Sequence, residues 1–283
     1  MFEKVSLGCD PEFGLIRNGG IVSASSVISG TEFGVDGCGR VAELRPNYAW
    51  TAKDLVNNIR EVLRYGYKNT AAIRDCVWKA GGMACDEPIG GHIHFGCAAL
   101  KKNDVATKFA GALNKTLAVL CLMVEDQEEA LNRRIGTSYG QVDSGEPYRA
   151  QSHGVEYRVL GSWLTAPDEA LAILSLAHLI SKHHDDDDVM DEANDLPAFE
   201  SRAFKTCDKI GLLYYLKPIV KFIRSLKGFD QHEEEIAPLL RLIKNQKIWS
   251  CHKNMIVTWG LAEEEKKEKK EVTGVKKGVA SYV

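Results

Sequence analysis

The sequence predicts an α+β fold, and three observations lead to this prediction. Short β-prone runs are concentrated in the first 165 residues, where they are mixed with long helical patterns. After residue 167 apolar residues recur at helical spacing nearly to the end of the chain. Strands and helices do not alternate regularly, which argues against repeated βαβ units.

The first fifty residues are expected to form short strands and turns. The run EFGLIRNGGIVSA places Asn-Gly-Gly between two β-prone segments, which is a hairpin signal. GVDGCGRVAELRP then predicts a glycine-rich turn and a strand that stops at Pro46. From Thr51 the period changes, because apolar residues between Leu55 and Leu63 share one helical face behind a capping pair of Thr51 and Asp54.

The middle of the chain returns to strands. We expect a strand at 90–97, a helix that Asn103 caps and that runs to Val124, and a further β-like stretch at 153–164. The polar, glycine-bearing stretch 132–155 is predicted to be a mobile loop. Pro167 stands at a favoured first position of the next helix.

These elements predict one domain over residues 1–262, strand-rich at 1–165 and helical at 166–262. The charged run EEEKKEKKE opens a tail, residues 263–283, that we expect to be disordered. A chain of 283 residues with 45% hydrophobic content can bury a sizeable core.

Net charge and the distribution of cysteines limit the partners and the cellular location that we expect. A net charge of −3 gives no electrostatic reason to expect nucleic acid or a membrane surface as a partner. The longest apolar run, Leu117 to Val124, is too short to cross a bilayer, and the N-terminus does not read as a signal peptide. The eight cysteines are scattered without a CxxC pair, so we expect reduced thiols and a cytoplasmic location.

Four short segments carry an unusual alternation. Residues i and i+2 of a strand lie on the same face, so each segment combines an apolar face with a face of acids, imidazoles or guanidiniums. The pairs on these polar faces are Asp10 with Glu12, Glu43 with Arg45, His92 with His94, and Glu156 with Arg158.

Each pair alone is compatible with the solvated face of an antiparallel sheet. Lysine, threonine and serine, which are usual on such faces, are absent from these eight positions. If the strands share a sheet, four carboxylates converge, and two such charges ~4 Å apart repel by roughly 4 kcal/mol at an effective dielectric near 20. Cations are needed to offset this repulsion. Oxygen-rich ligands suit Mg²⁺ or Mn²⁺, and arginines suit phosphate.

A family resemblance follows from the order of five motifs: GCDPEF, AELRP, GGHIHFG, NRRIGTSYG with GEPYR, and HGVEYRVLGSWL. This set resembles the phage-type COOH–NH2 ligases (type 2 amidoligases), which are relatives of glutamine synthetase and glutamate–cysteine ligase. The resemblance spans residues 5 to 170. It implies a glutamine-synthetase-like domain, in which a curved antiparallel sheet has helices on its convex face and binds ATP with divalent metals on its concave face.

The resemblance also implies an activity. An ATP- and Mg²⁺-dependent (or Mn²⁺-dependent) enzyme of this type transfers the γ-phosphoryl group to a substrate carboxylate. An amine then attacks the acyl phosphate, which gives an amide, ADP and phosphate. The expected partners are small-molecule or peptide carboxylates and amines, with neither nucleic acid nor membrane. A homo-oligomer is conceivable by analogy with glutamine synthetase, and host cytoplasm is the expected location if a phage encodes the chain.

The resemblance and the chemistry of the residues together assign roles. Five residues are expected to be metal ligands: Asp10, Glu12, Glu43, His92 and Glu156. His94, Arg45, Arg158 and Gly91 are expected near the nucleotide, with Gly90 and Gly91 allowing close approach of the backbone. Arg158 would stabilise the transferring phosphoryl group. Arg134 and Arg149, in a glycine-bearing lid at 132–152, could clamp a carboxylate or phosphate or could simply be surface charges. The order of His92 as ligand and His94 as its companion is open.

Two alternatives stay in competition with the ligase. One is a phosphotransferase on the same fold that resembles the guanidino kinases and leaves the phosphate on its acceptor. The other is a metal-binding hydrolase, or an inactive binding module, that uses HIH and the carboxylates without a nucleotide. The products of the reaction distinguish the three.

Overall fold

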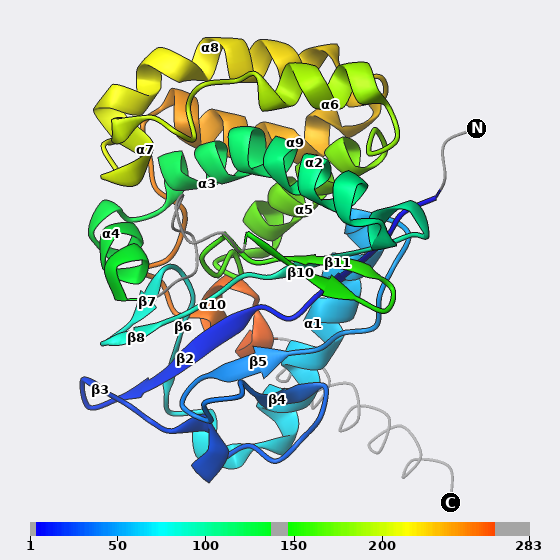
Figure 1. The fold of residues 1–283 in the computed structure, drawn as a ribbon. Helices are drawn as coiled ribbons and strands as arrows, with labels where there is room; N and C mark the ends of the chain where they lie inside the picture. Colours follow the sequence, from blue (N-terminus) through cyan, green and yellow to red (C-terminus); the bar gives the residue numbers. More distant parts are fainter. Residues whose placement is uncertain (1–3, 137–146, 264–283) are drawn as a thin grey trace, which may run out of the picture.

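The computed structural model describes residues 4–136 and 147–263 (Figure 1). The predicted tail falls outside these residues except for Glu263, and so does the middle of the predicted lid, residues 137–146, with Gly140 and Gly145. One continuous core of buried side chains extends from Val5 to Leu261, so it includes both the strand-rich and the helical part of the chain.

Two antiparallel sheets are joined end to end where β1 of the first is followed by β2 of the second. β1 (Ser6–Cys9) and β2 (Glu12–Arg17) are separated only by Asp10 and Pro11. The first sheet has the order β1, β9 (Ile93–Gly96), β11 (Gly154–Tyr157) and β10 (Tyr148–Gln151). The second has the order β3 (Gly20–Ile21), β2, β5 (Ala42–Leu44) and β4 (Phe33–Val35), with β6 (Val77–Lys79) also paired to β2.

Backbone hydrogen bonds join these sheets across the Asp10–Pro11 junction. The N–H of Glu12 donates to the carbonyl of Gly90 at 2.8 Å, in line with the pairing of β1 and β9. Every strand pair is antiparallel, including the small hairpin of β7 (Met83–Ala84) and β8 (Glu87–Pro88). The predicted α+β class, with an antiparallel sheet, is confirmed.

The predicted hairpin after Glu12 forms between β2 and β3. Asn18 and Gly19 both have positive φ, 53° and 77°, which is the backbone of a tight two-residue hairpin turn. Asparagine and glycine are the residues that tolerate this conformation best, so the sequence specifies the turn locally.

The joined sheets have two chemically different faces. On one face the side chains of Leu7, Phe13, Phe95 and Tyr157 are fully buried. Helix α1 (Ala52–Asn69) and helix α2 (Asn103–Leu113) pack on this apolar side, where Phe95 meets Phe109 of α2 edge-to-face at 4.9 Å. The alternate residues point the other way, and they include the acids and imidazoles that the sequence singled out.

Helix α1 begins as predicted. The side-chain oxygen of Thr51 accepts the N–H of Asp54 at 3.1 Å, which satisfies one of the N–H groups left unpaired at a helix start. Leu55, Ile59 and Leu63 are fully buried, so the predicted apolar face is the one that packs.

The second long helix differs in detail from its prediction. Lys102 rather than Asn103 is the N-cap of α2, and it makes no side-chain cap bond. Helix α2 continues through a π-helical turn, Asn114–Ala118, into α3 (Val119–Val124). At that turn the buried Asn114 accepts a hydrogen bond from the Tyr157 hydroxyl at 2.8 Å, which ties the helix to the sheet. The stretch Asn103–Val124 has the length and composition of a membrane span, but 78% of its most apolar part is buried inside the protein, as in a core helix.

The predicted loop at 132–155 is wrong at both ends. Helix α4 (Gln127–Gly136) occupies its first residues, and β10 with the turn into β11 occupies its last. The polar composition of β10 misled the prediction, because this edge strand exposes Arg149 and Ala150 and is held by its antiparallel pairing with β11.

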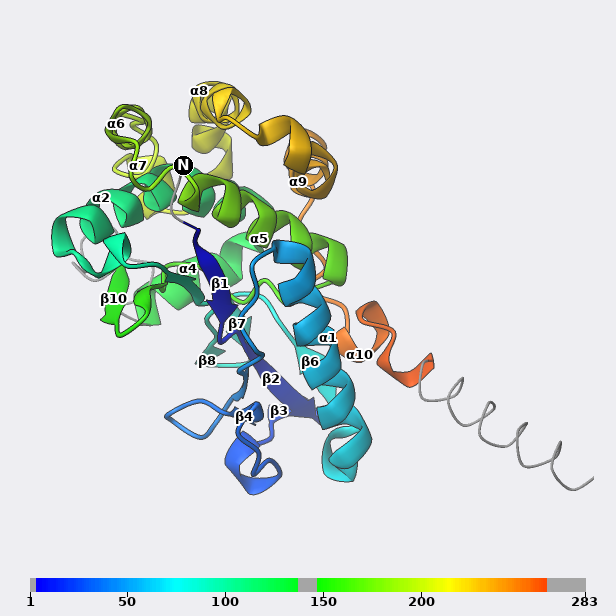
Figure 2. The same cartoon turned by 90° about the vertical axis from the view of Figure 1, so that its right-hand side faces the viewer.

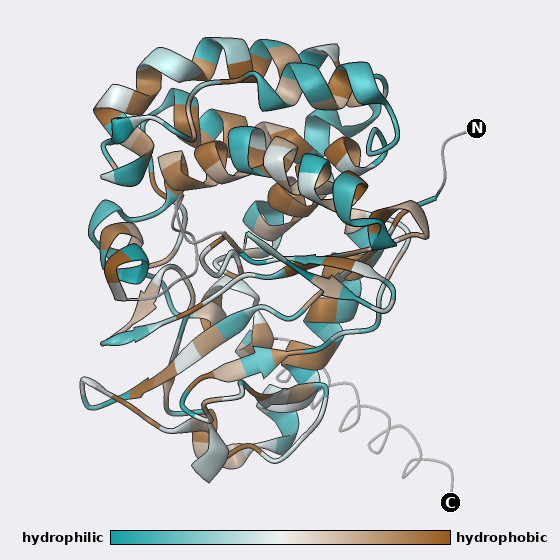
Figure 3. Ribbon diagram, in the orientation of Figure 1, coloured by the Kyte–Doolittle hydropathy of each residue, from teal (hydrophilic) through white to brown (hydrophobic). Residues whose placement is uncertain are grey.

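Helices form a layer over the sheet in the second half of the chain (Figures 1 and 2). They are α5 (Pro167–Ser181), α6 (Asp187–Asn194), α7 (Arg202–Lys205), α8 (Lys209–Ser225) and α9 (Phe229–Lys244). The short α10 (Met255–Thr258) lies apart from this layer, next to β6. Pro167 is at the start of α5 as predicted. Brown and teal alternate along α8 and α9 in Figure 3, as expected of amphipathic helices with one exposed face.

After α9 the chain returns to the sheet. The N–H of Trp249 donates to the carbonyl of Val124 at 2.9 Å, and the Asn254 side chain accepts the N–H of Trp78 in β6 at 3.1 Å. The Trp259 indole donates to the carbonyl of Leu164 at 2.8 Å. This C-terminal segment, residues 249–262, therefore lies against both β6 and α3. Short 3₁₀ turns occur at Ala24–Ser26, Ala71–Ile73 and Ala99–Lys101.

Candidate functional site

The strand register brings the polar residues of distant segments together. Glu12 of β2 is directly opposite Glu43 of β5, and Glu156 of β11 is directly opposite His94 of β9. The side chains of Glu12, Glu43, His92 and Glu156 are at most 9% exposed. Acids and imidazoles buried to this degree are rare without a partner or a ligand.

These residues form two clusters rather than one. In the first, ligand atoms of Asp10, His94 and Glu156 lie within 4.8 Å of one another. In the second, carboxylate oxygens of Glu12, Asp36 and Glu43 do the same. Asp10 lies between β1 and β2 and Glu12 begins β2, and each belongs to a different cluster.

The first cluster combines nitrogen and oxygen donors. Asp10 Oδ1 lies 3.1 Å from Nε2 of His94 and 3.4 Å from Nδ1 of His92. Neither Asp10 Oδ1 nor His94 Nε2 has a well-aligned hydrogen-bond partner among the described residues. Burial acts to raise the pKa of Asp10, but the two imidazoles hold it well below its usual value. An ionised carboxylate beside two imidazole nitrogens is a donor set that fits a divalent cation.

His92 lies beside the first cluster and lines the same cavity as Glu12 of the second. Its Nδ1 is 3.4 Å from Asp10 and 3.7 Å from Glu156, and its ring also faces Gly90, where a Cβ atom would approach Nε2 to 2.6 Å. Glycine at position 90 is thus required by the imidazole. The N–H of Gly90 donates to Glu12 Oε2 at 2.7 Å, which orients that carboxylate.

The second cluster contains only oxygen donors. Burial, followed by the charge of Asp10, raises the pKa of Glu43 to about 8, against the opposing effect of Arg45. Burial also raises the pKa of Glu12. The Asp36 carboxylate accepts the N–H of Cys38 at 3.2 Å, and contacts of this kind outweigh its burial and lower its pKa. Three carboxylates this close repel one another, and an oxygen-binding cation such as Mg²⁺ or Mn²⁺ would remove the repulsion.

Arginines surround Glu156, which is fully buried. Arg149 Nε and Nη2 donate to its two oxygens at 2.8 and 2.9 Å, so the pair is bidentate. Arg158 Nε lies 3.2 Å from Oε1, and the Gln151 amide donates to Oε2 at 2.5 Å. The side chain of Arg149 is 54% exposed, so it can also meet a group that enters from solvent.

A cavity of about 490 Å³ borders the second cluster and these arginines, and His92 connects it to the first cluster. Its volume is within the range of sites for small ligands. Acidic and basic side chains both line it. The polar lining consists of Glu12, Asp36, Cys38, Glu87, His92, Arg133, Arg149 and Arg158, and residues 37 and 88–90 complete the wall. Acids on one wall and arginines on another suit a ligand that carries both metal ions and anionic groups.

Three residues with predicted roles lie elsewhere. Arg134 points away from the cavity, donates to the Phe204 carbonyl at 3.0 Å, and stacks over the Phe204 ring. Arg45 bridges Glu43 at 2.8 Å and the carbonyls of Thr31 and Val35, so it contacts the second cluster from its rim. Gly91 faces the interior, where a Cβ would meet the Gly161 carbonyl at 2.4 Å. Gly90 is the glycine that lines the cavity.

The structure places several residues at the site to which the sequence prediction gave no role, among them Asp36, His153, Gln151 and Arg133. Asp36 is two residues beyond Gly34, which pairs with Glu43, so the alternation used for the other strands would have found it had β4 been recognised. His153 lies behind His94, with 3.2 Å between their ring nitrogens. Gln151 and Arg133 are also new. Arg133 is buried and donates to the carbonyls of Ile89 and Val159 at 3.0 and 2.8 Å, which fixes the cavity wall.

A family model described as "Phage phiEco32-like COOH.NH2 ligase-type 2" matches residues 7–261. No match to the chain was found among curated proteins. Among solved structures, one described as "Crystal structure of novel glutamine synthase homolog" is similar with a TM-score of 0.39 and 10% identity over 86% of this chain and 71% of that chain.

Proposed function

The chain belongs to the phage phiEco32-like COOH.NH2 ligase-type 2 family, and we propose that it joins a carboxylate to an amine at the expense of ATP, with Mg²⁺ or Mn²⁺. The name of the family describes the joining of a carboxylate to an amine. The nucleotide, the metal and the acyl-phosphate route are our inference. The observation that supports them is one cavity lined by Glu12 and Asp36 of the second cluster, by His92 beside the first cluster, and by three arginines, two of which pair with Glu156.

The metal ligands of this proposal come from both clusters. Asp10, His94 and Glu156 would hold one cation, and Glu12, Asp36 and Glu43 a second. His92, with Nδ1 3.4 Å from Asp10 and 3.7 Å from Glu156, could contribute to the first. Cations held by protein carboxylates neutralise nucleotide phosphates and leave positions open to them.

The arginines are placed for the phosphoryl group. Phosphoryl transfer needs positioning and charge neutralisation more than covalent help. Arg158 and Arg149 pair with Glu156 and also line the cavity, so they can exchange part of this pairing for phosphate oxygens. Arg133 is fixed by backbone carbonyls and supplies a positive charge that does not move.

The reaction balances in two steps. A substrate carboxylate oxygen attacks the γ-phosphorus of ATP, the bond to the bridging oxygen breaks, and ADP leaves. The amine nitrogen then attacks the carbonyl carbon of the acyl phosphate, the C–O bond breaks, and phosphate leaves while the nitrogen gives up one proton. Water must be kept from the acyl phosphate between the steps. A recessed cavity with buried ligands favours this exclusion.

Product analysis tests the proposal. Purified protein is incubated with ATP, Mg²⁺ and a pool of amino acids and amines, and the products are identified by mass spectrometry. We expect an amide, with ADP and phosphate in equal amounts, and a hydroxamate when hydroxylamine replaces the amine. A phosphorylated acceptor without amide would select the phosphotransferase instead. Absence of nucleotide binding in calorimetry would contradict both.

A matched pair of variants ties any activity to the site. Glu156→Ala removes a buried acid of the first cluster, whereas Glu128→Ala removes an exposed acid of α4. The first is expected to be inactive and the second to retain activity. Both should keep the circular dichroism spectrum of the wild type.

A further inference from the structure

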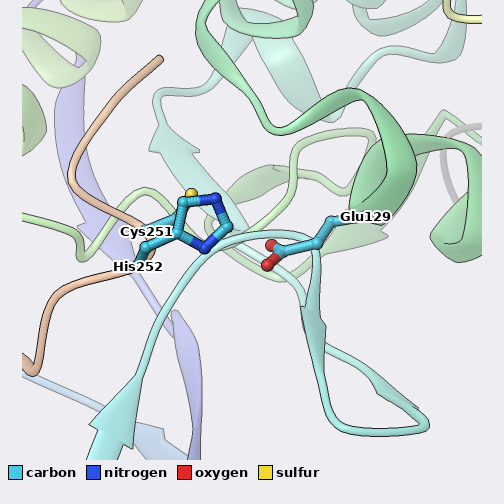
Figure 4. A group of neighbouring side chains, drawn as sticks. All are labelled: Glu129, Cys251 and His252. Atoms are coloured by element: carbon cyan, nitrogen blue, oxygen red, sulfur yellow. The ribbon is translucent and has the colours of Figure 1, made fainter.

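A second group of metal-binding side chains lies outside the cavity, where the C-terminal segment meets α4 and the turn between β6 and β7. Glu129 of α4, Cys251 and His252 each bring one potential ligand atom into a group that spans no more than 4.8 Å. Figure 4 shows the His252 imidazole and the Glu129 carboxylate facing one another beside Cys251. We propose that these three residues form a zinc site that fastens the C-terminal segment to α4.

The imidazole is already oriented as in a metal site. Nε2 of His252 lies 3.2 Å from Oδ2 of Asp126, and Oδ1 of Asp126 accepts the N–H groups of Glu128 and Glu129, both at 3.0 Å. Metal-binding histidines commonly donate their other ring N–H to a carboxylate. With the proton on Nε2, the lone pair is on Nδ1, which makes Nδ1 the ligand nitrogen.

The carboxylate of Glu129 is also held in place. Its Oε1 lies 2.6 Å from the Lys79 ammonium, and its Oε2 accepts the N–H of Gly82 at 3.0 Å. Gly81 has a φ of 121° and lies so close that a Cβ would meet Oε2 at 2.6 Å and the Cβ of Cys251 at 3.0 Å. The glycine backbone thus forms a tight wall that a larger residue would disrupt.

The donor set selects the class of metal. A thiolate, an imidazole and a carboxylate suit Zn²⁺, whereas Mg²⁺ prefers oxygen ligands alone. Three protein ligands with a water molecule complete a tetrahedral site. Ligand atoms on such an ion lie roughly 3.5 Å apart, given Zn–S and Zn–N bonds of about 2.3 and 2.0 Å. Small side-chain rotations would bring the three residues to this spacing.

The charges around the thiol are compatible with a divalent ion. Burial, followed by the charge of Glu129, raises the pKa of Cys251 to about 12, so without metal the thiol is neutral and is a poor nucleophile. Binding of a metal displaces the thiol proton. The thiolate, Glu129 and Asp126 then supply three negative charges next to the ion and the Lys79 ammonium.

The position of the site gives it a structural role. Glu129 is one helical turn before Arg133, which lines the cavity of the functional site. Two residues after His252, Asn254 holds β6 through the N–H of Trp78. A metal ion at this place would therefore join α4, β6 and the C-terminal segment. We expect it to stabilise the fold without contacting the substrate.

Cobalt substitution tests the site. Metal-free full-length protein is titrated with Co²⁺, which has the same ligand preferences and gives a near-ultraviolet charge-transfer band only when a thiolate is bound. We expect the band in the wild type and its loss in Cys251→Ser. Cys38→Ser, which changes the thiol that lines the functional cavity, should keep it. Absence of the band in the wild type, or its persistence in Cys251→Ser, would overturn the proposal.

Two further variants keep the test decisive if Cys251→Ser does not fold. His252 has a side chain that is 60% exposed, so His252→Ala should fold, and we expect its Co²⁺ affinity to fall at least about 10-fold. Asp126→Asn should lower the affinity about 10- to 100-fold through the loss of the oriented imidazole. Zn²⁺ should raise the Tm of the wild type and not that of His252→Ala. Unchanged Co²⁺ affinity in both variants would contradict the assignment.

Discussion

The polar face of the sheet buries charged groups, whereas the helical layer above it buries apolar groups, so burial has opposite effects on stability in the two regions. The sheet face buries Glu12, Glu43, His92 and Glu156, groups whose transfer from water costs free energy. Helix α5 buries a nearly continuous apolar run from Ala170 to Ile180. The apolar helices and the apolar side of the sheet stabilise the fold, and that stability offsets the cost of the charged face. Substitutions in the two regions should therefore have separable effects on activity and on stability.

The largest expected effect comes from the buried acid of the first cluster. Glu156→Ala leaves Arg149, Arg158 and a bound cation without their shared partner, so we expect activity to fall on the order of 10³-fold. Steady-state rates of amide formation measure this loss. The free energy of unfolding should also fall, because Arg158 and its neighbours keep a buried positive charge without its partner, so the rate is measured at a temperature where the variant is folded. A variant that is less stable but has the specific activity of the wild type would contradict a role of Glu156 in the reaction.

The second effect is a loss of stability without a loss of activity, from a substitution in the helical layer. Leu176 of α5 is fully buried, and Leu176→Ala should lower the free energy of unfolding by about 3 kcal/mol through lost burial and a residual cavity. Leu213→Ala, at a position that is 40% exposed, is the matched control and should cost far less. Urea denaturation gives both values. At temperatures where Leu176→Ala is folded, its rate should equal that of the wild type, and a lower rate would show that the two regions are coupled.

A pH effect should arise in the helical layer. Burial, followed by the charges of Lys182 and His232, lowers the pKa of His178 to about 4, while Glu235 opposes the shift. As the pH falls below about 6.5, the unfolded chain binds a proton that the folded protein does not, so stability declines progressively towards pH 4.

Denaturation at pH 7.5 and pH 4.5 measures this decline. The contribution of His178 should amount to about 2–3 kcal/mol, and His178→Gln should remove it. An identical pH dependence in the wild type and the variant would show that other groups are responsible.

The smallest of these effects concerns the second cluster. Asp36→Asn keeps the shape of the side chain but removes a charge from a three-carboxylate group, so we expect Mn²⁺ affinity to fall about 10- to 100-fold. Asp188→Asn, an exposed acid at the start of α6, is the control and should bind Mn²⁺ as the wild type does. Equal affinities in the two variants would remove Asp36 from the site.

Local rules predicted much of the fold. The Asn18–Gly19 turn, the Thr51 cap and the Pro167 helix start depend on a few neighbouring residues, and all three occur. The strand at Tyr148–Gln151 escaped prediction because an edge strand can be polar on both faces and is defined by its partner β11. Pairing partners are far apart in the chain, and single-segment patterns do not contain them.

The candidate site was predictable in its residues but not in how they group. Alternation along each strand identified which side chains share a face, but the stagger between strands decides which of them meet. That stagger joins Asp10 to Glu156 and Glu12 to Glu43. Arg133 and Arg134 are adjacent in the sequence, and only the rotation of α4 places Arg133 in the cavity and Arg134 against Phe204.

Counting the metal ions bound to the sheet face tests the central claim most directly. Metal-free protein is titrated with Mn²⁺ in the presence of a non-hydrolysable ATP analogue, and free Mn²⁺ is measured by electron paramagnetic resonance. The Cys251→Ser background excludes the proposed zinc site. We predict two tightly bound ions per chain, with one fewer in Glu43→Gln. A chain that binds no Mn²⁺ with the nucleotide would contradict the account.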